Sequence, residues 1–231
     1  MTNDDLFDHY ADDYEEELSK AISASGEGRD YFARGRVAWL RHCLRKLGES
    51  PRSVLDFGCG DGATTPLLLS LLQASSAIGV DVSEKSLEIA RKRSPSPEFV
   101  FETLRSFQPT GTADLAYCNG VFHHIPPDER AGALALVNHA LRKGALFALW
   151  ENNPWNPATR YVMSRCSFDC DAQTLTPPET RSLLREGGFE ILRTDFRFIF
   201  PHALRAFRKL EDLAHALPLG AQYQVLSRKI R

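Results

Sequence analysis

The 231-residue sequence lacks a long apolar run and an excess of basic charge. No apolar stretch approaches the ~20 residues that a membrane-spanning helix needs. The formal net charge of −2 gives no sign of the basic face that nucleic-acid-binding proteins usually carry. The first residues, MTNDDLFDHY, are acidic and so differ from a secretory signal. We therefore expect a cytoplasmic protein with no membrane span and no nucleic-acid partner.

The sequence also lacks a paired set of cysteines, because its five cysteines are an odd number scattered along the chain. Such a set fits a reducing compartment better than a disulfide framework. Cys166 and Cys170 lie four positions apart, but no matching pair of ligands accompanies them, and structural zinc normally takes four ligands. We therefore expect no metal site.

Short apolar runs alternate with helix-like stretches, which is typical of a mostly parallel sheet covered by helices. We expect Asp61 and Ser83 to cap helices, and Thr176 with Glu179 to form a capping box. The expected strands are 53–57, 77–80, 98–101, 113–118, 144–150, 190–198 and 221–229. The expected helices are 8–20, 31–47, 63–72, 83–93, 126–141, 176–187 and 203–216.

The strongest motif is a glycine-rich bend after the first expected strand, within VLDFGCGDGA at 54–63. Gly58 and Gly60 allow a tight turn and a close approach by a ligand, because they carry no Cβ. The helix beyond the bend offers backbone N–H groups to a carboxylate or phosphate. Asp56 ends the first strand, where its carboxylate could meet an ammonium group, and Asp81 ends the second, where an acid can accept from two ribose hydroxyls. The pattern alone fits a dinucleotide as well as an adenosyl cofactor.

Four segments, in order, resemble the motifs of class I S-adenosylmethionine-dependent methyltransferases that act on small molecules. They are FDHYADDY at 7–14, similar to an N-terminal helix that covers the cofactor, the glycine bend at 54–63, GVDVS at 79–83 and LAYCNGVFHHIPPDE at 115–129. The resemblance spans about residues 7–150. It implies an α/β fold: a Rossmann-like, doubly wound, seven-stranded, mostly parallel sheet with an antiparallel last strand and helices on both faces.

The resemblance also implies S-adenosylmethionine as cofactor, S-adenosylhomocysteine as its product, and a role for each matching residue. Asp81 would hold the ribose, with Val82 against the adenine. The bend at 58–61 would line the methionine part, and the segment at 119–121 would pass beneath the sulfonium. Tyr14 and an arginine, Arg34 or Arg36, could close over the cofactor, since an arginine suits its carboxylate.

The third expected strand departs from the family pattern, which often has an acid there for the adenine amino group. Here the region reads Phe-Glu-Thr-Leu-Arg at 101–105, so Thr103 with backbone groups, or Glu102, would substitute. The full set of expected cofactor residues is Tyr14, Arg34, Asp56, Gly58, Cys59, Gly60, Asp61, Asp81, Val82, Thr103, Leu104, Asn119, Gly120 and Val121.

His123 and His124 follow the fourth expected strand, on the expected face of the site. A histidine can accept a proton near neutral pH, and we take His124 as the candidate base. The other interpretation is that one histidine packs while the other orients the loop. A histidine pair with no carboxylate companion is a poor metal site.

We expect a single domain over residues 1–231. Its parts would be an N-terminal helical lid at 1–50, a cofactor-binding core at 51–151, an acceptor-side excursion at 152–176, and C-terminal helices and strands at 177–231. In the excursion, Trp155, Tyr161 and Phe168 form an acceptor wall or anchor the loop to the core, two interpretations that stay open.

The expected activity is methyl transfer to a small-molecule acceptor, such as a hydroxyl or amine of a sugar or natural product, by a monomer or homodimer. Two alternatives stay open. One is an NAD(P)-dependent oxidoreductase, which would lack a recognisable Tyr-x-x-x-Lys pair. The other is a non-catalytic cofactor-binding protein, since a fold does not prove an activity.

Overall fold

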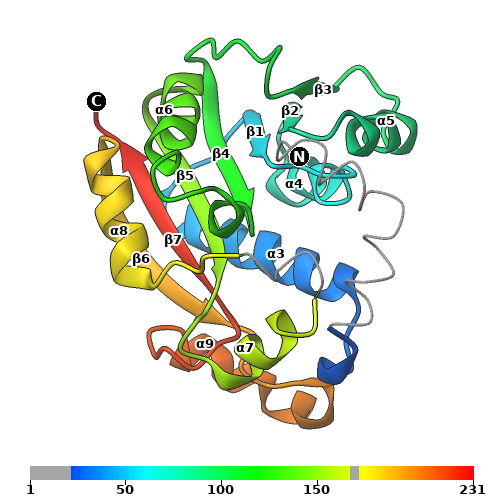
Figure 1. Cartoon of the computed structure of the whole chain (residues 1–231), viewed down its shortest axis with the longest axis vertical. Helices are drawn as coiled ribbons and strands as arrows, with labels where there is room; N and C mark the ends of the chain where they lie inside the picture. The colour runs from blue at the N-terminus through cyan, green and yellow to red at the C-terminus, as the bar shows by residue number, and fades with distance from the viewer. Residues whose placement is uncertain (1–21, 167–171) are drawn as a thin grey trace.

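The computed structural model describes residues 22–166 and 172–231, although not the side chain of Ala24 (Figure 1). The expected helix at 8–20, with Tyr14, lies outside the described residues, as do Phe168 and Cys170. No described helix is both long and apolar enough to cross a membrane.

Seven strands form one sheet in the order β3-β2-β1-β4-β5-β7-β6. The neighbouring pairs among β1 to β5 are parallel, and β7 is antiparallel to both β5 and β6. The strand that runs against the others is therefore β7, and the expected sheet is confirmed. The bounds are β1 Ser53–Phe57, β2 Ser76–Asp81, β3 Phe99–Thr103, β4 Ala113–Asn119, β5 Leu141–Asn152, β6 Phe189–Arg197 and β7 Gln222–Lys229.

Helices cover both faces of the sheet, so the strands are apolar along their length (Figure 1). Because side chains alternate along a strand, Val54 of β1 packs toward α3 and α4, whereas Leu55 and Phe57 pack toward α6 and α8. The helices are α3 Arg29–Leu47, α4 Thr65–Leu72, α5 Glu84–Arg93, α6 Arg130–Ala140, α7 Pro157–Met163, α8 Pro177–Glu186 and α9 Glu211–Ala214, and the 3₁₀ segments are η1 Ser23–Ser25, η2 Phe122–His124 and η4 His202–Leu210.

Two of the three expected caps are confirmed. The Ser83 hydroxyl accepts from the Ser86 N–H, and Thr176 with Glu179 forms the capping box. Asp61 is not a cap, because Arg29 and Arg93 hold its carboxylate and α4 begins only at Thr65.

The expected single helix at 203–216 is also wrong. The chain forms η4 and then the short α9, and Leu204 leaves the helical dihedral region with φ −109° and ψ 21°.

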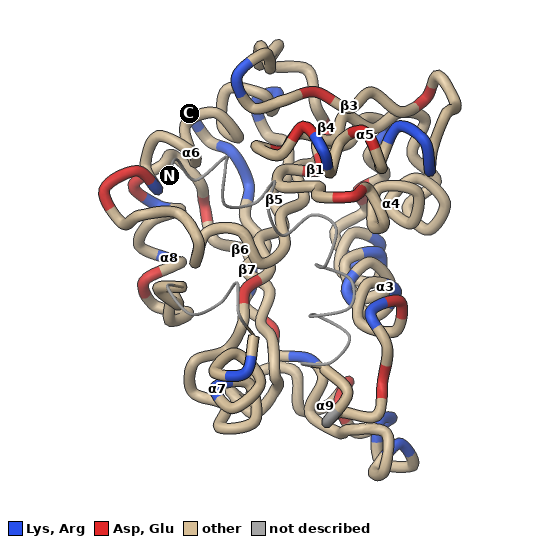
Figure 2. The backbone as a smooth tube through the Cα atoms, turned by 45° about the vertical axis from the view of Figure 1, so that its right-hand side comes forward, with Lys and Arg blue, Asp and Glu red and all other residues tan. Residues whose placement is uncertain are grey.

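Charged residues of both signs are spread along the backbone, with Lys and Arg recurring along α3 (Figure 2). Since the first five strands are parallel, their carboxyl ends meet at one edge of the sheet. That edge brings Asp56, Asp81 and Asn119 into one region, where two basic residues of α3, Arg29 and Arg36, line the same cavity as these side chains.

Candidate active site

A cavity of about 890 Å³ lies at the carboxyl edge of the sheet. Small-molecule sites in proteins commonly enclose about 300–1,000 Å³. The expected residues that line the cavity are Asp56, Gly58, Cys59, Gly60, Asp61, Asp81, Val82, Leu104, Asn119, Gly120, Val121 and His124. The structure thus gathers most of the residues that the sequence predicts, from four separate segments of the chain.

Two expected residues, Arg34 and Thr103, do not line this cavity. Arg34 is exposed on α3 and pairs with Asp30 at 2.6 Å. Residues two apart are separated by about 200° around a helix axis, so it is Arg36 that turns inward, where it is buried and lines the cavity. The Thr103 hydroxyl lies 2.8 Å from that of Ser106 instead.

The glycine bend after β1 is held by its neighbours on both sides. The N–H groups of Gly58 and Cys59 donate to the Val80 carbonyl at 2.7 and 3.1 Å. Gly58 has φ +73°, and a Cβ there would lie 2.2 Å from a Val121 methyl group. Only glycine therefore lets the loops after β1 and β4 meet beneath the cavity.

The Asp81 carboxylate ties the bend to the start of α5. One oxygen accepts from the Gly60 N–H at 2.7 Å and the other from the Ser83 N–H at 3.0 Å. Burial raises the pKa of Asp81, and these backbone donors oppose that rise. The acid predicted from its spacing therefore also shapes the glycine bend.

Asp56 is buried at the floor of the cavity, where its carboxylate accepts from the Thr65 hydroxyl at 2.7 Å. Burial raises the pKa of Asp56 to about 7, while the Thr65 hydrogen bond lowers it. Nearby, the buried Asn119 Oδ1 has no hydrogen-bond partner among the described residues. Both groups can accept hydrogen bonds from a cation in the cavity.

Arg36 crosses from α3 to the far strands of the site. Its Nε donates to the Tyr117 hydroxyl at 3.2 Å, and its Nη1 donates to Gln222 Oε1 at 2.9 Å. The Gln222 amide in turn donates to Asn152 Oδ1 at 3.1 Å. This chain of hydrogen bonds fixes a guanidinium beside the cavity.

A buried carboxylate, that of Glu151, accompanies the histidine pair. The sequence predicted the two histidines but not this carboxylate. Glu151 Oε2 lies 2.5 Å from His123 Nδ1, and both side chains are buried. The rings of His123 and His124 lie 4.1 Å apart between centroids, and both line the cavity. The available signal was an acid closing the apolar strand sequence ALFALWE at 145–151, since a buried strand seldom carries one without a partner.

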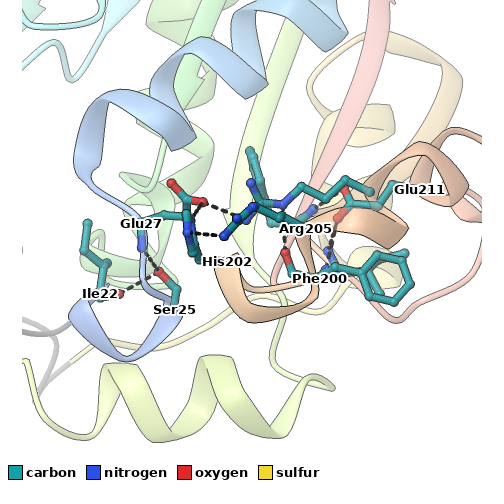
Figure 3. Close-up of polar contacts among 10 residues, drawn as sticks. Ile22, Ser25, Glu27, Phe200, His202, Arg205 and Glu211 are labelled. Carbon is teal, nitrogen blue, oxygen red and sulfur yellow. Dashed lines mark hydrogen bonds and ion pairs between the residues drawn. The ribbon is translucent and has the colours of Figure 1, made fainter.

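Another part of the cavity lining is aromatic and basic. Tyr31, Phe32 and Phe198 contact one another edge to face, with centroids 5.0–5.9 Å apart. Arg208 lies over the Tyr31 ring and pairs with Glu27. Glu27 also contacts His202 (Figure 3). Of the predicted aromatic residues, Tyr161 lines the cavity, whereas Trp155 is half exposed and stacks on Phe196.

Residues 54–144, which carry the glycine bend, Asp81 and the histidine pair, match the family model of a methyltransferase domain. This part of the chain therefore matches a methyltransferase domain. The methyl donor of this family is S-adenosylmethionine.

Curated relatives of this methyltransferase domain include enzymes named trans-aconitate 2-methyltransferase. The protein from Rhizobium etli is 43% identical over 75 residues, which cover 32% of this chain and 29% of that protein. The protein from Rhodopseudomonas palustris is 33% identical over 141 residues, which cover 60% of this chain and 54% of that protein. The chain thus matches about a third to a half of the length of these relatives.

Solved methyltransferase structures share the fold. An S-adenosylmethionine-dependent methyltransferase from Mesorhizobium loti superposes with a TM-score of 0.58 at 22% identity, covering 78% of this chain and 91% of that one. Magnesium protoporphyrin IX methyltransferase from Synechocystis, solved with bound S-adenosylhomocysteine, gives 0.63 at 18% identity, covering 98% and 97%. The family match favours a methyltransferase over the oxidoreductase alternative.

Proposed function

We propose that this protein transfers a methyl group from S-adenosylmethionine to a small-molecule acceptor. The observation that carries the proposal is that the glycine bend, Asp81, Asn119 and the histidine pair all line one cavity. Such an arrangement can bind an adenosyl amino acid at one end and present an acceptor at the other.

The residues present fit the cofactor. Asp81 has lone pairs beyond those that Gly60 and Ser83 use, so it can also accept from the ribose hydroxyls. The unpartnered Asn119 Oδ1 suits the ammonium group of the methionine part. Val82 and Leu104, both on the cavity, would flank the adenine.

Arg36 replaces Arg34 in the proposed cofactor site. Its Nη2 is not used by the hydrogen bonds to Tyr117 and Gln222, and arginine binds carboxylates well. We assign it to the carboxylate of the methionine part.

Within the proposed single domain, the excursion at 152–176 is the acceptor side. Its residues Thr159, Tyr161 and Val162 line the cavity. Catalysis would come mainly from positioning the acceptor and excluding water, with a base from the histidine pair, for which the sequence favours His124. The lid at 1–50, the cytoplasmic location and the monomer or homodimer stay predictions.

Two classes of acceptor are candidates for the methyl group. A hydroxyl or amine of a sugar or natural product follows from the resemblance, whereas the names of the relatives favour a carboxylate such as trans-aconitate. A hydroxyl must lose a proton during methylation, whereas a carboxylate is already ionised at neutral pH. The two candidates therefore differ in their need for a base.

Calorimetric titration with S-adenosylhomocysteine tests the cofactor site. Asp81→Ala removes a carboxylate that holds both ligand and bend, so we expect affinity to fall about a hundredfold or more, since hydrogen bonds to charged groups contribute about 1.5–3 kcal/mol each. Asp114→Ala is the matched control, because Asp114 also accepts from two backbone N–H groups but lies outside this cavity. Unchanged affinity in Asp81→Ala, or binding of NAD in place of the adenosyl ligand, would refute the proposal.

A further inference from the structure

The side chains of His123 and Glu151 form a buried pair that joins two elements of the fold. Glu151 comes from the end of β5 and His123 from η2, 28 positions earlier. The His123 Nδ1 to Glu151 Oε2 distance is 2.5 Å, and the side chains are only 3% and 1% exposed. A buried carboxylate is costly unless it is partnered, so this contact must serve either the fold or the chemistry.

Glu151 fixes the protonation pattern of the imidazole. Its other oxygen, Oε1, accepts from the Phe122 N–H at 2.9 Å, so the carboxylate cannot rotate without losing a bond. With Glu151 ionised, its oxygens only accept, and the contact then places the ring hydrogen of His123 on Nδ1. A neutral ring then carries its lone pair on Nε2, which is the form that a general base requires.

The ring faces the turn where the methyl group is expected. A Cβ at Gly120 would lie 3.5 Å from His123 Cε1, the carbon between the two ring nitrogens. Gly120 and His123 both line the cavity. The edge of the ring that carries Nε2 is thus near the segment proposed to run beneath the sulfonium.

Other titratable groups also lie around Glu151, on β4, β7, α6 and η2. Burial raises the pKa of the Cys118 thiol on β4 and of the Tyr223 hydroxyl on β7, so both stay neutral. Arg130 on α6 donates to the carbonyls of Phe122, Ile125 and Gln173. His124 packs on the His123 ring.

We propose that His123, held by Glu151, is the base of the reaction and that the acceptor is a hydroxyl compound. The inference rests on the proposed methyltransferase function. As the acceptor oxygen forms its bond to the methyl carbon, the carbon–sulfur bond breaks and its electron pair stays on sulfur, converting the sulfonium into a thioether. The hydroxyl proton passes to His123 Nε2, and the Glu151 carboxylate stabilises the resulting imidazolium until the proton leaves to solvent.

Glu151→Gln is the decisive variant, because the amide has nearly the same shape. Its oxygen can still accept from the Phe122 N–H, but its NH₂ then donates to Nδ1 and places the ring hydrogen on Nε2. The ring can no longer accept a proton there, so we expect kcat to fall about a hundredfold or more. The acid limb of the kcat–pH profile should vanish, whereas affinity for S-adenosylhomocysteine should change less than twofold.

The assay uses S-adenosylmethionine with a tritiated methyl group and a panel of phenols, sugars, primary amines and trans-aconitate. Methylation of a hydroxyl compound, with these effects of Glu151→Gln, supports the proposal. Methylation of trans-aconitate alone, or a kcat for Glu151→Gln within threefold of the wild type, overturns it. Loss of the acid limb in His124→Gln but not in Glu151→Gln would also overturn it, by making His124 the base.

A control and a second readout keep the test decisive. Glu179→Gln is the matched control, since Glu179 also accepts a backbone N–H but caps α8 outside the cavity. If no panel member is methylated, ¹⁵N shifts of the His123 ring in the S-adenosylhomocysteine complex decide. The hydrogen should lie on Nδ1 in the wild type and on Nε2 in Glu151→Gln, and the same tautomer in both overturns the inference. Failure to bind S-adenosylhomocysteine overturns the proposed function instead.

Discussion

At the residue scale, Asp56 carries a charge that depends on what the cavity holds. Burial raises its pKa to about 7, so near neutral pH the empty site keeps a proton on part of the molecules. An ammonium group beside the carboxylate would lower that pKa. We expect binding of S-adenosylhomocysteine at about pH 6.5 to release protons, and Asp56→Asn to abolish the release. Titrations in two buffers of different ionisation enthalpy measure it, and equal release by both proteins would contradict the assignment.

The same shift makes stability depend on pH. The unfolded chain releases the Asp56 proton near pH 3.8, whereas the folded chain holds it until about pH 7. The folded state therefore binds more protons between these values, so the contribution of Asp56 is present below the lower value and is lost as pH rises through the higher one. Urea unfolding at about pH 5 and pH 7.5 should show a steeper loss for the wild type than for Asp56→Asn. Parallel losses would show that Asp56 is ionised throughout.

At the element scale, two glycines of the bend allow backbone strain to be separated from a steric clash of an added Cβ. Gly58 and Gly60 both have positive φ, +73° and +54°, but only a Cβ at Gly58 meets another side chain within 4 Å. Gly60→Ala should cost the dihedral strain alone, about 1–2 kcal/mol. Gly58→Ala should cost more, because Val121 must also move. Thermal unfolding compares the two, and equal losses would mean that the loop after β4 yields without cost.

One carboxylate, that of Glu211, accepts from three N–H groups of the connection between β6 and η4. Glu211 is buried and accepts from the N–H groups of Phe198, Ile199 and Phe200 at 3.0–3.2 Å, while Phe198 adopts the left-handed region at φ 65° (Figure 3). Glu211→Ala leaves these donors without their acceptor, so we expect a loss of about 1–3 kcal/mol in the free energy of unfolding.

The neighbouring carboxylate supplies the control for this prediction. Asp212→Ala removes an exposed partner of Arg197 and should cost less than about 1 kcal/mol. Urea unfolding of both variants decides, and equal losses would show that Glu211 does not hold the connection.

At the scale of the whole molecule, the sequence predicted features that depend on neighbouring residues better than contacts between distant ones. The strands were predictable because each strand of a sheet that is buried on both faces has a nearly continuous apolar sequence. The glycine bend and Asp81 were predictable because their order along the chain mirrors their order in space. Glu151 was not assigned, because its partner lies 28 positions away, and Arg34 was chosen over Arg36 because helical phase was not applied.

Two segments that are far apart in the sequence, the entry to α3 and η4, meet at the cavity through Glu27. Its carboxylate lies 2.8 Å from both His202 Nδ1 and Arg208 Nη2, so the entry to α3 is tied to η4 (Figure 3). Hydrogen bonds from Arg208 and His202 lower the pKa of Glu27 below its ordinary 4.5. The contact is therefore fully present above that value and is lost as pH falls through the lower folded value.

Glu27→Gln should loosen this contact without unfolding the domain. The amide keeps the size of the side chain and an oxygen that can still accept from Arg208, so we expect a small change in melting temperature but faster amide hydrogen exchange at 22–28 and in η4. Glu98→Gln is the control, because that carboxylate is exposed and accepts a hydrogen bond from the nearby Ser96 hydroxyl rather than from η4. At acid pH, amide exchange in these segments of the wild type should become as fast as it is in Glu27→Gln. Exchange that is the same in Glu27→Gln, Glu98→Gln and the wild type would show that packing alone, through the aromatic contacts of Tyr31 and Phe198, joins these two segments.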